Sequence, residues 1–164
     1  MIGMRTSLEH MAWSNQKIFT LIQQLPEDVY SKSAIEGEWP VGKLLTHFLS
    51  AAEWYRFLLT GEEWTELSDV GEHSAANKSA EALAQLDEVL MTYANFPDSK
   101  ITFLGDDGNQ TTTSRELVLT QAAMHAAEHK GQIATILKIH GYHLDLDALD
   151  IWSFASMKKN NGDI

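Results

Sequence analysis

The segment 114–140, SRELVLTQAAMHAAEHKGQIATILKIH, has the spacing of one long amphipathic α-helix. Its apolar residues include Leu117 and Met124, which are seven residues apart, and Ile133, which is three residues from Ile136 and four from Leu137. Thr113 followed by Glu116 predicts a capping box at the start, and Gly141 can adopt the left-handed conformation that ends a helix. At about 1.5 Å per residue the helix would extend roughly 40 Å, which is long enough for one wall of a bundle.

Two histidines, His125 and His129, lie in the middle of this helix. Because they are four residues apart, they are separated by about 40° around the helix axis, and both imidazoles project from one face. That spacing suits two ligands of a single metal ion. A pair on one helix leaves the coordination shell incomplete, so a third ligand has to come from elsewhere in the chain. The alternative is that these histidines are hydrogen-bonded core residues.

Three further segments show the same helical period. They are residues 6–25, ended by Pro26, residues 40–60, ended by Gly61, and residues 79–96, ended by Pro97. The sequences KITFL (100–104) and QTTT (110–113) flank the turn residues GDDGN and predict a short β-hairpin between the third and fourth helices. The apolar tail at 143–156 predicts a short C-terminal helix. We therefore predict an all-α fold, a four-helix bundle, in a single domain over residues 1–164.

The second predicted helix supplies a candidate for the third ligand. One stripe along it contains Leu44, His47, Ser50 or Ala51, Trp54 and Leu58. Because His47 shares this stripe with apolar residues that must face the core, we expect it to point inward. In a bundle, inward side chains of facing helices build the cofactor sites, so His47 is the natural partner of the histidine pair.

Composition limits the chemistry and the partners. The chain contains no cysteine, so any metal site must rest on histidines and carboxylates. The formal net charge is -11, and the basic residues form no patch beyond the pair Lys158 and Lys159, which disfavours direct binding to nucleic acid or to anionic membranes. No segment approaches the roughly 18 apolar residues of a membrane-spanning helix, and the start MIGMRTSLEH lacks the apolar core of a signal peptide. We therefore expect a soluble, cytoplasmic protein.

Together these residues resemble the DinB/YfiT family of four-helix-bundle metalloproteins. The first helix reads MAWSNQKIF, similar to the family's Trp-x-Asn helix, and the fourth reads HAAEHKGQIATILKIHG, similar to its H-x-x-x-H run followed by a basic residue, Gly and Gln. The resemblance spans nearly the whole chain and implies His47, His125 and His129 as the metal ligands. One departure precedes the second helix, where the family often has a Ser or Thr cap and this chain has Trp39 and Pro40.

The resemblance also carries expectations about function. It implies a metal-dependent hydrolase or a thiol-dependent S-transferase that acts on a small-molecule substrate, such as a low-molecular-weight thiol. The ion would be Zn²⁺, Ni²⁺, Mn²⁺ or Fe²⁺, because a three-histidine site with open positions suits each of them. A homodimer packed helix against helix is a further implication. The alternative function is a stress-related metal-binding protein without catalysis.

Two more residues of the fourth helix are candidates for the pocket. Gln132 lies three residues after His129 on the same side, so it could hydrogen-bond a ligand, and Glu128 could border the site. Residues 125–129 also match the H-x-x-E-H zinc-protease pattern, in which Glu128 would be the general base. That fold needs more chain than the 35 residues after His129, and it leaves His47 unexplained. A di-iron bundle is excluded as well, because no glutamate here has a histidine three residues later.

Overall fold

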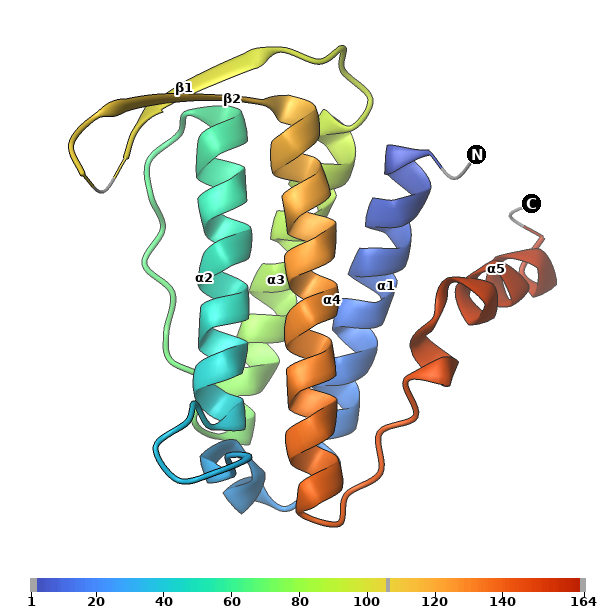
Figure 1. Cartoon of the computed structure of the whole chain (residues 1–164). Helices are drawn as coiled ribbons and strands as arrows, with labels where there is room; N and C mark the ends of the chain where they lie inside the picture. The colour runs from blue at the N-terminus through green and yellow to red at the C-terminus, as the bar shows by residue number, and fades with distance from the viewer. Residues whose placement is uncertain (1–2, 106, 163–164) are drawn as a thin grey trace.

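Four long helices pack side by side in the computed structural model, which describes residues 3–105 and 107–162 (Figure 1). They are α1 (Met4–Ile22), α2 (Val41–Thr60), α3 (His73–Tyr93) and α4 (Arg115–Ile139). α1 and α2 each contact both α3 and α4. α2 and α3 run in one direction and α1 and α4 in the other, which is possible because the loop 61–72 returns along the length of α2 (Figure 1). The prediction of an all-α four-helix bundle is confirmed.

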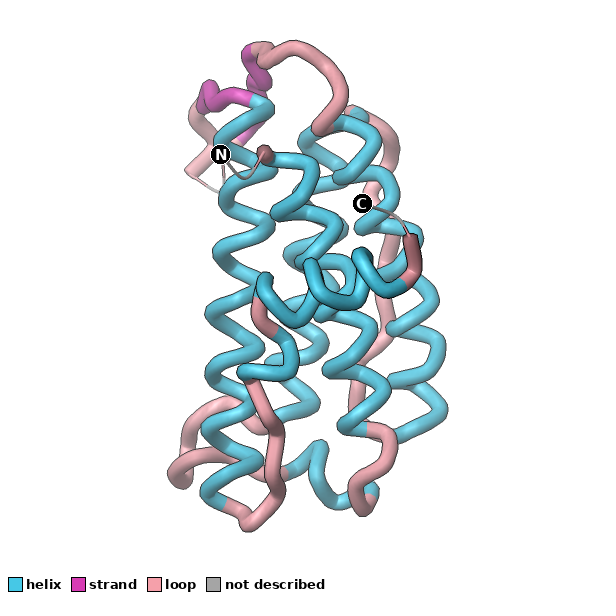
Figure 2. Tube along the Cα trace, turned by 90° about the vertical axis from the view of Figure 1, so that its right-hand side faces the viewer, coloured by secondary structure: helices cyan, strands magenta, loops and turns pink. Residues whose placement is uncertain are grey.

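The smaller elements lie at the ends and on the outside of the bundle. They are η1 (Glu27–Ser31), β1 (Lys100–Leu104), β2 (Gln110–Ser114), η2 (Asp147–Leu149) and α5 (Ile151–Asn160). The two strands form the predicted antiparallel hairpin between α3 and α4, and it lies across the end of the bundle where α2 finishes (Figure 1). α5 is the predicted C-terminal helix, and it lies across the outside of the bundle in contact with α1 (Figure 2).

The core runs along the axis between the four helices. Its largest fully buried apolar side chains are Leu8, Ile18, Phe19 and Ile22 of α1, Leu45 and Leu49 of α2, Leu83 and Leu90 of α3, and Leu119, Ile133 and Leu137 of α4. Burying each such side chain contributes about 1.5–3 kcal/mol, so the four helices are held together chiefly by this contact. Within the described residues, no helix is long and apolar enough to span a bilayer.

Several predicted boundaries are wrong by a few residues. α3 begins at His73 rather than at residue 79, because HSAANK is helical without showing apolar periodicity. α1 ends at Ile22, and its last predicted turn is replaced by the approach to η1. The predicted Thr113 capping box is also wrong, because the Oγ of Ser114 accepts from the backbone N–H of Leu117 at 3.2 Å. Gly141 has φ of 80° and ends α4 as expected.

The apolar face predicted for α4 needs one correction. Leu117 and Met124 are 60% and 65% exposed, so neither belongs to the core. Ile133, Ile136 and Leu137 are buried as predicted. In the first half of the helix the buried positions are instead taken by Val118, Leu119, Ala122 and Ala126.

The loop 61–72 is fixed along α2 by specific contacts. The guanidinium of Arg56 donates to both carboxylate oxygens of Glu53, at 2.7 Å each, and Glu53 also accepts from the backbone N–H of Thr65 at 2.7 Å. Further along, the carbonyl oxygen of Val70 lies only 2.3 Å from where a Cβ on Gly42 would be, so only glycine permits this approach. The loop is therefore held against the same helix that carries His47.

Candidate metal centre

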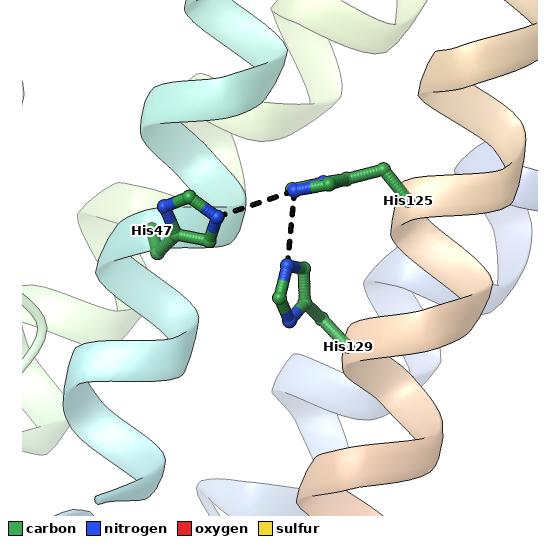
Figure 3. A group of neighbouring side chains, drawn as sticks. All are labelled: His47, His125 and His129. Atoms are coloured by element: carbon green, nitrogen blue, oxygen red, sulfur yellow. Dashed lines mark hydrogen bonds between the residues drawn. The ribbon is translucent and has the colours of Figure 1, made fainter. Parts of the chain in front are cut away.

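His47, His125 and His129 converge at one point between α2 and α4 (Figure 3). The Nε2 atom of His125 lies 3.2 Å from Nε2 of His47 and 2.9 Å from Nε2 of His129. One ring nitrogen of each histidine lies within 4.8 Å of those of the other two. Nitrogen ligands about 2.0–2.1 Å from a tetrahedral ion are about 3.3 Å apart, which is close to the spacing found here. The group could therefore hold one metal ion.

Gln132 orients one of the three rings. The Nδ1 atom of His129 donates to the Oε1 of Gln132 at 2.7 Å. Because a neutral imidazole carries only one proton, this hydrogen bond leaves the Nε2 of His129 as an acceptor that faces the other two histidines. Hydrogen bonds of this kind fix the tautomer and the ring angle of histidines that bind metals. The spacing of three residues between His129 and Gln132 places the amide where this contact can form.

The surroundings of His47 and His125 favour neutral imidazoles, the form that binds metals. Burial, together with the charges of His129 and His47, lowers the pKa of His125 to about 4. Burial and the neighbouring His129 also lower the pKa of His47 below its ordinary value. A charged imidazole is disfavoured here because it would be poorly solvated and close to like charges. At neutral pH, His47 and His125 are therefore in the form that can bind a cation.

The low pKa of His125 leads to a prediction for metal-free protein. Because the pKa in the folded chain is below the ordinary value of 6.5, the contribution of neutral His125 to stability is complete above pH 6.5 and is lost as the pH falls towards 4. In the presence of chelator, the parent chain should therefore lose more unfolding free energy than His125→Gln across this pH range. Denaturant unfolding of both proteins at several pH values measures the difference. If the difference in unfolding free energy between the two proteins stays constant with pH, the pKa of His125 is not lowered in the folded chain.

Two aromatic residues that were not predicted as site residues pack against the cluster. Trp39 meets the ring of His47 edge to face, with 5.1 Å between centroids. Tyr55 is buried and lies edge to face with His125 at 6.1 Å. Trp39 occupies the position where the chain departs from the family pattern, and α2 starts after Pro40 without a side-chain cap. The Trp39-Pro40 pair before α2 was therefore the feature of the sequence that could have indicated the contact between Trp39 and His47.

Among the described residues, the histidines border three cavities that are large enough for a small molecule. A cavity of about 890 Å³ is lined by His129, Gln132, Glu128 and Trp39 among others. Two cavities of about 540 Å³ adjoin His47, and one of these also touches His125 beneath Trp54, Trp64 and Phe103. Glu128 is exposed at the wall of the first cavity and is not one of the three clustered ligand groups.

A buried polar network lies behind the cluster and was not predicted. The ammonium group of Lys130 donates to the Oγ of Ser14 and, at 3.0 Å, to the Oδ1 of Asn15. The amide of Asn15 donates in turn to Asp87 at 3.0 Å. The network joins α1, α3 and α4 next to His129. Its sequence signal was present, because Asn15 and Lys130 both belong to the segments that carry the family resemblance.

The bundle and the three converging imidazoles define a class of protein, a four-helix bundle that can bind a divalent ion through histidines of two facing helices. The chain belongs to the DinB family, whose model matches residues 2–152. It is also similar to Protein DinB of Bacillus subtilis (strain 168), with 23% identity over 150 residues that cover 82% of this chain and 84% of that protein. The family expected from the sequence is confirmed.

Proposed function

We propose that the protein binds one divalent ion through His47, His125 and His129 and uses it as a metal-dependent hydrolase or thiol-dependent S-transferase. The observation that carries this proposal is the group itself, three histidines whose ring nitrogens converge beside open cavities. Structural zinc sites are closed by four protein ligands, whereas catalytic sites have three and keep a position open for substrate. Three imidazoles beside cavities fit the catalytic pattern.

The chain's own residues account for binding and orientation in this proposal. When bound, the ion would supply Lewis-acid chemistry, polarising a carbonyl or lowering the pKa of a water or thiol. Gln132 holds the ring of His129 in the orientation that a ligand needs. The lowered pKa of His125 keeps that imidazole neutral and able to bind well below neutral pH. The neighbouring cavities, of about 540 and 890 Å³, have the size of small-molecule sites.

The proposed ion is Zn²⁺, Ni²⁺, Mn²⁺ or Fe²⁺. Imidazole ligands suit zinc, nickel and iron, while manganese more often takes oxygen ligands, which substrate or water would have to supply. Elemental analysis of protein from cells grown with all four metals separates these candidates. The ion that is retained in stoichiometric amount and restores turnover after chelation would be the functional one.

Turnover assays test the proposed activity. Esters, amides and adducts of low-molecular-weight thiols should be screened with metal-loaded protein, with chelated protein and with the His125→Ala variant. We expect at least one substrate to be turned over by the loaded protein only, with activity lost on chelation and regained on adding metal. Stoichiometric metal without turnover of any of these substrates would instead favour a non-catalytic, stress-related metal-binding protein.

We also propose that the protein is a homodimer packed helix against helix. Leu117 and Met124 support this proposal, because they are exposed large apolar residues on α4 and are seven residues apart, which places them on one side of the helix. Sedimentation equilibrium should give twice the mass of the 18.4 kDa chain. The variant Met124→Glu should shift it to the monomer mass, whereas a parent protein that is monomeric at micromolar concentration would exclude the dimer.

A further inference from the structure

One cavity beside His129 has walls that combine apolar and acidic side chains. It has a volume of about 890 Å³ and lies between the second half of α4, the chain leading into α2, and Leu146 in the tail that follows α4. At its inner end it touches His129 and Gln132, the hydrogen-bonded pair of the metal centre. A molecule in this cavity could therefore contact His129, one of the three clustered histidines, with one end.

The outer wall of this cavity gathers large apolar side chains that are exposed to solvent. Ile35 is 65% exposed, Trp39 42% and Leu146 43%, and all three line the same cavity. Single exposed apolar residues are common on proteins, but apolar residues that gather round one concave site mark a place where an apolar ligand binds. Deeper in the cavity, Leu44 and Ile136 continue the apolar surface.

The charged side chains that line the cavity are acidic. Apart from His129, they are Glu38 and Glu128. The Nζ atom of Lys43 lies 5.0 Å from the ring centroid of Trp39, but Lys43 lines a neighbouring cavity. With two carboxylates and no lining lysine or arginine, this wall disfavours anionic groups and favours neutral or positively charged groups next to it. The formal charge of -11 on the whole chain acts in the same direction.

Gly131 keeps the cavity wall open. Glycine inside a helix is unfavourable because of its backbone freedom, so a packing or functional reason is expected. Packing does not supply one here, because a Cβ on Gly131 would meet no atom within 4 Å. Gly131 lines the cavity two residues after His129, where any side chain would extend into open space at the wall.

We propose that this cavity binds the apolar part of the substrate, and that Gly131 determines how much room it has. The ligand class is a small molecule with an aliphatic or aromatic body and a neutral or cationic outer end, with its reacting end beside His129. That this ligand is a substrate rests on the proposed metal-dependent function. Binding in the cavity depends only on its walls and can be measured separately.

A matched set of probes tests this assignment on the full-length protein as purified. Trimethyl(4-phenylbutyl)ammonium and 4-phenylbutane-1-sulfonate share one apolar body, and neither end group is a strong metal ligand. Calorimetric titration should give a dissociation constant about tenfold lower for the ammonium probe than for the sulfonate probe. A few favourable charged contacts commonly produce a difference of this size. In the double variant Glu38→Gln, Glu128→Gln, the two probes should bind with constants within about threefold of one another.

Substitutions at the wall test the role of Gly131. Gly131→Leu should weaken the ammonium probe by about tenfold or more, and Ile35→Ser, which changes an exposed loop residue, should weaken it about threefold. Ala127→Leu is the matched control, because it creates the same side chain one turn earlier on α4, at a residue that lines a different cavity, under α5. The affinity of Ala127→Leu for the ammonium probe should stay within about twofold of that of the parent. Gly131→Ala should melt about 2–4 °C higher than the parent, as expected for glycine replaced inside a helix without a clash.

The outcomes separate this proposal from the proposed function. The cavity assignment is wrong if folded Gly131→Leu and Ile35→Ser both bind the ammonium probe as tightly as the parent, or if the sulfonate binds as tightly as the ammonium. Metal content is measured on the same samples. Protein that binds the probes as expected but takes up no metal would refute the metal-dependent function and leave the cavity assignment standing. Protein that retains metal but does not bind the probes as expected would refute the cavity assignment alone.

Discussion

Protein saturated with a divalent ion should melt well above metal-free protein, and the His47→Ala variant should lose most of that gain. An ion that binds only the folded chain adds RT ln(1 + [L]/Kd), which is about 2.7 kcal/mol at a hundredfold excess over Kd. For a chain of this size that corresponds to a rise of roughly 5–11 °C in Tm. His125 and His129 come from α4 alone, whereas His47 comes from α2, so the third ligand couples metal binding to the packing of two helices.

Thermal melts with and without metal measure this effect. His143→Ala serves as the matched control, because His143 is exposed beyond the end of α4 and should leave the rise unchanged. Chelated His47→Ala should remain folded, since the core beneath it is apolar and intact. If His47→Ala keeps the full metal-dependent rise, the third ligand is a different group.

The second large effect should come from the buried polar network. Asp87 and Lys130 are 1% and 7% exposed, and Asn15 bridges them through hydrogen bonds of 3.0 Å. Burial raises the pKa of Asp87 to about 7 and lowers that of Lys130 to about 8, and in each case the charge of the other group opposes the shift. The charge of Lys130 favours the ionised form of Asp87, and the charge of Asp87 favours the ammonium form of Lys130, so each charge depends on the other for compensation in the interior.

Asp87→Ala should therefore lower the free energy of unfolding by about 3–5 kcal/mol, because it leaves the ammonium of Lys130 buried without its charge partner. Denaturant unfolding measures this loss. Glu81→Ala, a change of an exposed carboxylate on the same helix, should stay within about 0.5 kcal/mol of the parent.

A double variant separates charge compensation from loss of packing. In Asp87→Leu with Lys130→Met both charges are replaced by apolar groups, and much of the lost stability should return. If the double variant is as unstable as Asp87→Ala, the loss comes from packing around Asp87 and not from an uncompensated charge.

The sequence was sufficient to predict the bundle and the convergence of the three histidines, because both depend largely on local periodicity. The spacing of His125 and His129 fixes their common face on any α-helix, and the apolar stripe of α2 fixes the direction of His47. The hairpin was equally local, since turn residues separate two β-forming runs. Each of these features can be read within a window of about 20 residues.

Other features depend on how distant segments meet, and the sequence could not supply them. Asp87 lies 72 residues from Asn15, and their contact exists only because α1 packs on α3. The approach of Trp39 to His47 depends on the path of an irregular segment before α2. Leu117 and Met124 satisfied the helical period and yet face solvent, because alanines and Val118 fill the narrow contact of α4 with its neighbours. Periodicity alone does not distinguish two possible apolar faces of one helix.

Elemental analysis of the purified protein tests the metal centre most directly. Protein prepared without an affinity tag and dialysed against trace divalent metals should retain about one ion per chain, because three ligands on two helices form one mononuclear site. The double variant His125→Ala, His129→Ala should retain almost none while staying folded. Metal content near zero in the parent protein, or equal content in the parent and the double variant, would contradict the assignment of His47, His125 and His129 as a metal centre.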